Sequence, residues 1–109
     1  MSEAIVEATD ENFDKIVVGE KGPMVIDFWA SWCGPCMSFK PTMEKIAEDM
    51  KDKIKVVMVE VDRSPQAAGK FNVMSVPTII ILKDGQVKGQ YTGALSEKDL
   101  KTKIEDAIK

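Results

Sequence analysis

Residues 24–29, Met-Val-Ile-Asp-Phe-Trp, are apolar at every position except Asp27. A continuous apolar run of this length is typical of a central strand covered on both faces by helices. Residues 32–36, Trp-Cys-Gly-Pro-Cys, follow shortly, and helical spacing of apolar residues then continues to about Lys51. We therefore expect a buried strand, a loop that carries both cysteines, and a long helix.

Strand and helix patterns alternate outward from this stretch. Before it, we expect a strand at residues 4–7 and a short helix that Thr9 caps and that buries Phe13. After it, we expect a strand at 54–61, a helix opened by Ser64-Pro65, a strand at 78–83, a turn at Asp84-Gly85, a strand at 86–92 and a helix capped by Ser96. This order predicts an α/β fold in which a mixed central sheet of about five strands is flanked by four helices. We expect residues 1–109 to form a single domain.

The composition excludes several classes of function. The chain of 109 residues has a net charge of -3 and no basic run, which disfavours nucleic acids and anionic membranes as partners. It has no histidine, so imidazole catalysis and imidazole metal ligands are absent, and two cysteines alone cannot complete a zinc site. We expect no metal. No secretory signal or membrane span is recognisable, and a cytoplasmic location is expected.

Cys33 and Cys36 lie where the loop meets the long helix. Free amides and the helix dipole favour an anion there, and the thiolate is the nucleophile of disulfide exchange. The two Cα atoms are expected about 5–6 Å apart, a distance that a disulfide can span. We expect Cys33, at the loop edge, to be exposed and to attack a substrate disulfide. Cys36 should be half-buried and resolve the mixed disulfide.

Asp27 is the expected proton acceptor for Cys36. A carboxylate within an apolar strand is costly to bury, and burial raises the pKa of such a group toward neutrality. The strand ends at the loop that holds the cysteines, so Asp27 can reach Cys36 through a water molecule. An exposed edge position for Asp27 is the alternative.

At this point the sequence resembles the thioredoxin family over essentially its whole length. The resemblance rests on residues 27–30, 32–36, 76–78, 83–85 and 93–94, and on Pro41 within the helix. It implies a general reductase of protein disulfides, with the Cys33–Cys36 disulfide as its redox group and no other cofactor. Its expected partners are a thioredoxin reductase and disulfide-containing client proteins, and the chain is expected to be a monomer.

The resemblance also implies roles for other residues. Pro77 is implied to be a cis-proline beside the disulfide, and the backbone of Val76 to pair with the substrate. The expected apolar rim for extended clients comprises Trp32, Gly34, Pro35, Val76, Pro77 and Gly93. Trp29 and Pro41 are expected to have structural roles.

Two positions depart from the family pattern. Met37 and Met58 stand where many thioredoxins carry basic residues, and at Met58 the usual lysine is a buried partner of the aspartate. Without that cation, we expect the pKa of Asp27 to be raised further, and the pH dependence of resolution by Cys36 to shift.

Two rival classes remain. One is a disulfide oxidase or isomerase on the same fold, which the missing histidine, the Gly34-Pro35 pair and the missing signal disfavour. The other is a module that does not use its thiols in catalysis, either a scaffold subunit or half of a zinc site shared across a dimer.

Overall fold

The elements of the fold follow the order expected from the sequence. The structure is a computed structural model that describes residues 3–109. Within them lie β1 (Ile5–Ala8), α1 (Phe13–Val17), β2 (Pro23–Trp29), α2 (Gly34–Asp49), β3 (Lys55–Glu60), a 3₁₀ turn (Val61–Arg63), α3 (Pro65–Lys70), β4 (Thr78–Lys83), β5 (Gln86–Thr92) and α4 (Glu97–Ala107).

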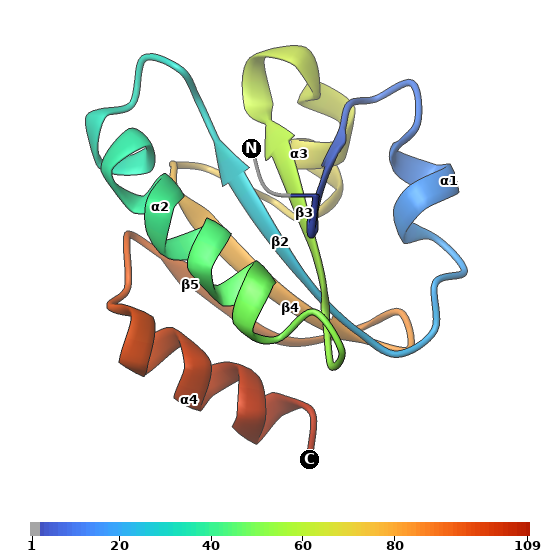
Figure 1. Cartoon of the computed structure of the whole chain (residues 1–109). Coiled ribbons are helices and arrows are strands. Elements are labelled where there is room, and N and C mark those ends of the chain that lie inside the picture. The colour runs from blue at the N-terminus through green and yellow to red at the C-terminus, as the bar shows by residue number, and fades with distance from the viewer. Residues whose placement is uncertain (1–2) are drawn as a thin grey trace.

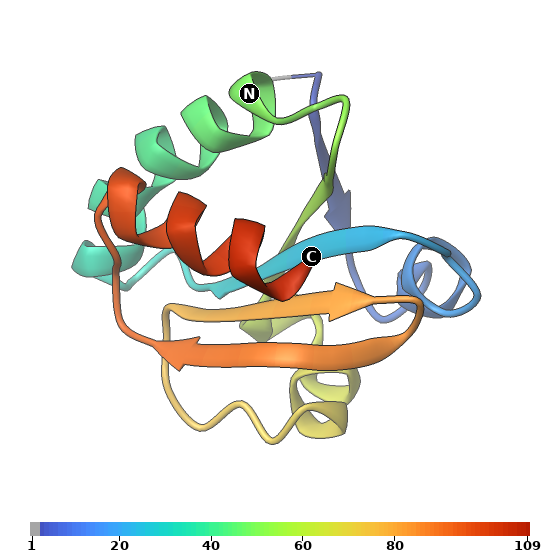
Figure 2. The ribbon, with the colours of Figure 1, turned by 90° about the horizontal axis from the view of Figure 1, so that it is seen from below.

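The strands form one mixed sheet in the order β1-β3-β2-β4-β5. Strand β3 pairs in parallel with both β1 and β2, whereas β4 is antiparallel to both β2 and β5. Figure 1 shows β2 in the middle, and Figure 2 shows the β4–β5 hairpin at one edge. The prediction of an α/β fold with a mixed five-stranded sheet is confirmed.

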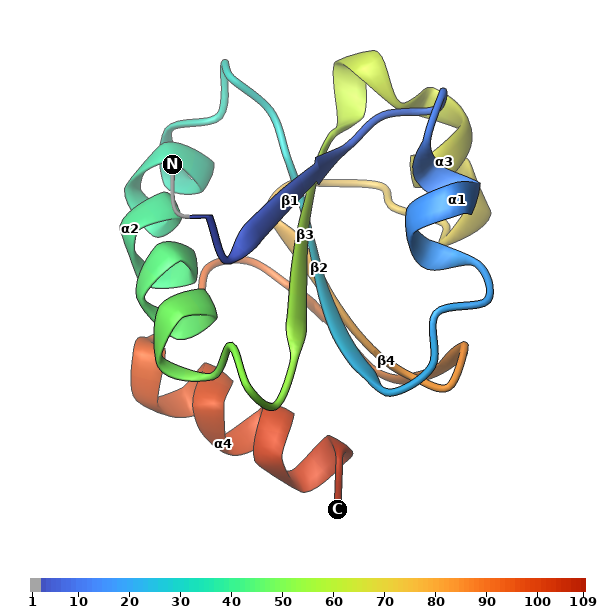
Figure 3. The ribbon, with the colours of Figure 1, turned by 45° about the vertical axis from the view of Figure 1, so that its right-hand side comes forward.

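Helices cover both faces of the sheet, as Figure 3 shows, with α2 and α4 on one side and α1 and α3 on the other. The alternation of side chains along β2 explains why both faces are apolar. Val25 packs with the residues under α2 and α4, whereas Ile26 and Phe28 pack with those under α1 and α3. Asp27 points to the same side as Val25, so this one carboxyl group lies beneath α2.

Thr9 does not cap α1 as expected, whereas Ser64 is the N-cap residue of α3 and Pro65 its first residue, as expected, although the Ser64 side chain makes no capping hydrogen bond. Helix α1 begins at Phe13, and the amide N–H of Thr9 donates instead to Oδ1 of Asn12 at 2.7 Å. The hydroxyl of Ser64 caps nothing in α3. The amides of Gln66 and Ala67 instead donate to the carboxylate of Asp10, at 3.0 and 2.9 Å. A hydrogen-bond acceptor from a distant part of the chain leaves no local sequence signal, which is why the sequence pattern did not identify Asp10.

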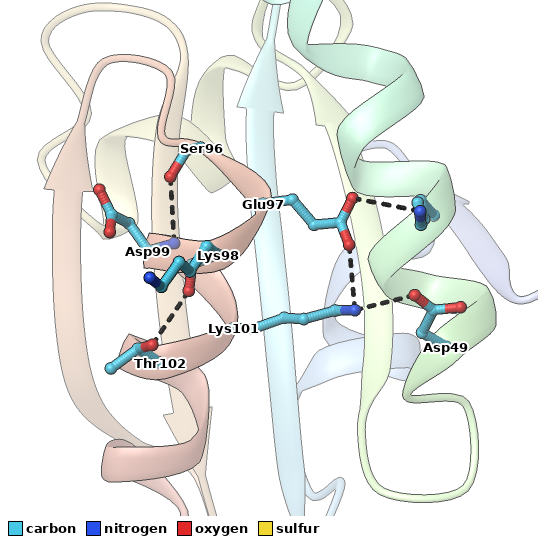
Figure 4. A network of polar contacts seen from close by, with 8 residues as sticks. Asp49, Ser96, Glu97, Lys98, Asp99, Lys101 and Thr102 are labelled. Atoms are coloured by element: carbon cyan, nitrogen blue, oxygen red, sulfur yellow. Dashed lines mark hydrogen bonds and ion pairs between the residues drawn. The ribbon is translucent and has the colours of Figure 1, made fainter.

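Polar contacts tie α4 to α2 (Figure 4). Lys101 of α4 donates to Asp49 at the end of α2 at 2.8 Å and to Glu97 at 3.1 Å. The hydrogen bond from Lys101 lowers the pKa of Asp49. As expected, Ser96 caps α4, because its hydroxyl accepts from the amide of Asp99 at 3.1 Å. The two helices on this face are thus held together along their exposed sides.

Candidate redox site

A disulfide joins Cys33 and Cys36 at the start of α2. Cys33 is the N-cap residue of the helix, and the amide N–H of Cys36 donates to its Sγ at 3.1 Å. The Cα atoms lie 5.2 Å apart, within the range expected from the sequence. Because this amide has no partner within the helix, it is available to stabilise negative charge on Cys33 after reduction.

Both cysteines are buried, with exposed fractions of 6% for Cys33 and 2% for Cys36. The expectation that Cys33 is exposed is therefore wrong for the oxidised chain, although it is the more accessible of the two. Its sulfur is covered from the β4 side, where the carbonyl oxygen of Val76 lies 3.7 Å away. Ala30 and the partly buried Trp29 complete the apolar cluster around the disulfide.

Trp32, next to Cys33 in the sequence, is a large apolar side chain that is 68% exposed. Its indole N–H donates to the carboxylate of Asp62 at 2.8 Å, which fixes the ring on the surface. Next to the ring is a shallow hollow of about 130 Å³ lined by Trp32, Val61 and residues 73–76. Met74 in this lining is 93% exposed. An apolar surface therefore adjoins the disulfide.

The remaining rim residues surround the same site. The Val76–Pro77 peptide bond is cis, and Pro77 itself is buried. The carbonyl of Pro77 accepts from the amide of Gly93 at 2.8 Å. Gly93 has φ +98°, a conformation that favours glycine. Gly34 and Pro35 are exposed in the first turn of α2, and Pro41, which has no amide N–H to donate, lies further along the helix.

Asp27 is buried beneath α2, with 1% of its surface exposed. In the sheet register it lies opposite Met58 of β3 on one side and Ile79 of β4 on the other. Neither carboxyl oxygen accepts a hydrogen bond from residues 3–109. Burial raises the pKa of Asp27 to about 7, and the ammonium of Lys40 opposes that rise. The alternative of an exposed edge position for Asp27 is therefore excluded.

Sequence reasoning missed two residues of this region, Lys40 and Asp62. Lys40 follows Cys36 by one helical turn, and its Nζ lies 4.9 Å from the centre of the Trp29 ring. Because residues four apart lie on the same side of a helix, the spacing between Cys36 and Lys40 could have identified Lys40 from the sequence. Asp62 gave no such signal, because its contact with Trp32 joins segments that are distant in the sequence.

Neither a metal site nor a membrane-spanning helix is found in the part of the chain that the structure describes. Residues 3–109 hold no group of three or more His, Cys, Asp or Glu side chains that could bind a metal ion. No helix among them has the length and apolar character needed to cross a membrane.

An α/β fold that places a disulfide at a helix start, above a buried carboxyl group, defines the class of proteins that carry out thiol–disulfide exchange. Comparison with known families agrees, since the sequence model of the family described as Thioredoxin matches residues 4–106. The chain belongs to the thioredoxin family. It is therefore a thiol–disulfide oxidoreductase that reduces protein disulfides, and in this family the redox group is the disulfide rather than a bound cofactor.

Individual relatives support the same assignment. The chain is 40% identical to a thioredoxin of Chlorobaculum thiosulfatiphilum over 102 residues, which cover 94% of each chain. It is 46% identical to a thioredoxin of Bacillus subtilis over 84 residues, or 77% of this chain and 79% of that one. It is also 37% identical to the chloroplastic thioredoxin Y1 of Arabidopsis thaliana, with 93% of this chain matching 59% of that protein.

Proposed function

We propose that Cys33 is the attacking thiol and Cys36 the resolving thiol of this reductase. The Cys33 thiolate attacks one sulfur of a client disulfide, forms a mixed disulfide and releases the other client sulfur as a thiolate. The Cys36 thiolate then attacks Cys33 Sγ, which restores the Cys33–Cys36 disulfide and releases the second client thiol. Two electrons pass from the dithiol to the client. The observation that carries this assignment is the amide of Cys36 directed at Cys33 Sγ, since it favours the thiolate at Cys33.

Asp27 is the acceptor of the proton that Cys36 loses before it attacks. With a pKa of about 7, the carboxyl group can take up and release a proton near neutral pH. No direct hydrogen bond joins Asp27 to Cys36, so the proton passes through a water molecule that reaches the site after reduction. This route supplies the general base that a chain without histidine needs.

The rim around the disulfide binds extended client segments. Trp32 and Val76 border the same hollow, and the apolar side chains there suit the unfolded segments that contain accessible disulfides. Gly34, Pro35, Pro77 and Gly93 complete this surface. Backbone pairing at Val76 would align the client sulfur with Cys33, whose Sγ lies 3.7 Å from the Val76 carbonyl oxygen.

The proposal extends to the location, the oligomeric state and the electron donor of the chain. The chain acts in the cytoplasm as a monomeric electron carrier and as one domain over residues 1–109. A thioredoxin reductase returns two electrons to the Cys33–Cys36 disulfide after each turnover. Membership of the thioredoxin family supports the reductase and the disulfide-containing clients in general terms.

Reduction of insulin with dithiothreitol as electron donor tests the proposed function. Wild-type protein should accelerate the precipitation of the insulin B chain, and Cys33→Ser should abolish the acceleration. Full activity of Cys33→Ser would contradict the assignment of the attacking thiol and would favour a protein whose thiols are not used. Thermal unfolding of both proteins in their reduced forms controls for loss of the fold.

A further inference from the structure

Two side chains of β2 and two of α2 lie between the sheet and the helix that covers it. Asp27 and Trp29 are two residues apart in a strand, so both point toward α2. Cys36 and Lys40 are four residues apart in α2 and lie one above the other on the same side of the helix. The Nζ of Lys40 lies 4.9 Å from the centre of the Trp29 ring. Lys40 is therefore held next to the strand position that flanks Asp27.

The other elements packed around Asp27 place apolar side chains next to it, and charged side chains lie at one edge of the sheet. The neighbouring strands place Met58 and Ile79 opposite it. The charged residues that line the hollow beside Trp29 and Met58, on the β1 and β3 side, are Glu7, Glu60 and Arg63. Among the charged groups of the described residues, the ammonium of Lys40 is the one that lowers the pKa of Asp27, and it acts against the effect of burial.

We propose that Lys40 is a positioning residue for disulfide reduction: its ammonium, seated on the Trp29 ring, supplies the cation of the Asp27–Cys36 proton-transfer site. This inference rests on the role proposed above for Asp27. When the Cys36 proton moves to Asp27, one negative charge moves from the carboxylate to the sulfur. The ammonium of Lys40 stabilises the carboxylate of Asp27, which is the form that can accept this proton.

Trp29 gives this arrangement its geometry. A partly exposed lysine has many rotamers, and in most of them its ammonium group is surrounded by water. An ammonium over the face of an indole ring is attracted by the negative face of the ring, which restricts Lys40 to positions near the sheet. Trp29 thus has two structural roles: its ring packs against the disulfide cluster, and it holds the ammonium of Lys40.

Titration of Asp27 in the oxidised protein, followed by carbon-13 NMR of its carboxyl group, tests the inference without any activity measurement. In Lys40→Met the pKa of Asp27 should rise by about half a unit, or roughly threefold in the ionisation constant. Lys40→Arg should retain the wild-type titration. The matched control is Lys45→Met, since Lys45 lies on the same helix but pairs with Glu97 at 3.7 Å. An unchanged Asp27 titration in Lys40→Met, or an equal shift in Lys45→Met, would overturn the inference.

A second readout separates this inference from the proposed role of Asp27. The rate at which Cys36 resolves a mixed disulfide is measured against pH, with and without Lys40→Met, in wild-type and Asp27→Asn backgrounds. Lys40→Met should move the profile to higher pH in the wild-type background and leave it unchanged in Asp27→Asn. A shift that persists in Asp27→Asn overturns the action of Lys40 through Asp27. If Asp27→Asn alone leaves the wild-type profile unaltered, the proposed proton acceptor is wrong, whereas the NMR titration still decides whether Lys40 and Asp27 interact.

Discussion

Asp27 of β2 lies opposite Met58 of β3 in the parallel register of the two strands. A carboxyl group and a thioether therefore face each other beneath α2, at a position where many thioredoxins have a carboxyl group and an ammonium. Burial dominates the titration of this carboxyl group and raises its pKa to about 7. The site consequently holds a group that changes its charge near neutral pH although the chain contains no histidine.

The first prediction concerns stability in Asp27→Asn. Asp27 ionises near its ordinary value of 3.8 in the unfolded chain and near 7 in the folded chain. Between these pH values the folded state binds more protons, so its stability falls as pH rises and stays reduced above about pH 7. Relative to wild type, Asp27→Asn should gain stability between pH 4 and pH 8, by an amount on the order of 4 kcal/mol at most. Urea unfolding across this pH range measures the gain.

Asp52→Asn is the control for this comparison, since Asp52 is an exposed carboxylate in the loop after α2. A difference between Asp27→Asn and wild type that does not change with pH, or that changes no more than the difference for Asp52→Asn, would show that Asp27 does not titrate near neutrality in the folded chain.

The second prediction concerns Met58→Lys. An ammonium opposite Asp27 should lower the pKa of the carboxyl group, typically by about 1–3 units for an opposite charge within hydrogen-bonding reach. Carboxyl NMR of the oxidised protein measures this shift. Met58→Leu keeps an apolar side chain at the position and should leave the titration near that of wild type. The absence of a downward shift in Met58→Lys would contradict the explanation of the raised pKa by burial without a nearby partner.

The third prediction concerns the cap of α3. Asp10→Ala removes the acceptor of two amide N–H groups and should lower the free energy of unfolding by about 0.5–2 kcal/mol. Ser64→Ala should be neutral or stabilising, because the buried Ser64 hydroxyl has no hydrogen-bond partner among the described residues. Denaturant unfolding of both variants compares them directly. A larger loss of stability in Ser64→Ala than in Asp10→Ala would show that the Ser64 hydroxyl makes the capping hydrogen bond, and would contradict the structure.

The fourth prediction concerns client binding by Trp32. Trp32→Ala removes the largest apolar side chain of the rim and should raise KM for insulin about fivefold, equivalent to roughly 1 kcal/mol. Trp32→Phe keeps a ring but loses the hydrogen bond to Asp62, and should give an intermediate KM. Val87→Ala, at an exposed apolar position in β5, is the control and should leave KM unchanged. An unchanged KM in Trp32→Ala would remove Trp32 from the client surface.

The sequence predicts those features that depend on local patterns. The apolar run at residues 24–29 predicts β2, and the turn residues Asp84 and Gly85 predict the hairpin, where both adopt positive φ of 52° and 81°. The burial of Asp27 follows from its apolar neighbours in the same way. Each of these signals lies within one element, and packing reinforces it.

Features that depend on contacts between distant segments are not predictable in this way. Asp10 caps a helix that begins at Pro65, and Asp62 holds the indole of Trp32. The low exposure of Cys33 also has a distant cause, because Val76 covers its sulfur. These contacts arise when the sheet brings strand ends together, and no spacing along the chain records them.

The mixed disulfide formed with insulin reveals which cysteine attacks the client. Reduced Cys36→Ser and reduced Cys33→Ser are each mixed with oxidised insulin, quenched with acid, and analysed by mass spectrometry. We predict a persistent adduct in Cys36→Ser, bonded through Cys33, and little adduct in Cys33→Ser. A persistent adduct through Cys36 in Cys33→Ser, with none in Cys36→Ser, would contradict the assignment of Cys33 as the attacking thiol.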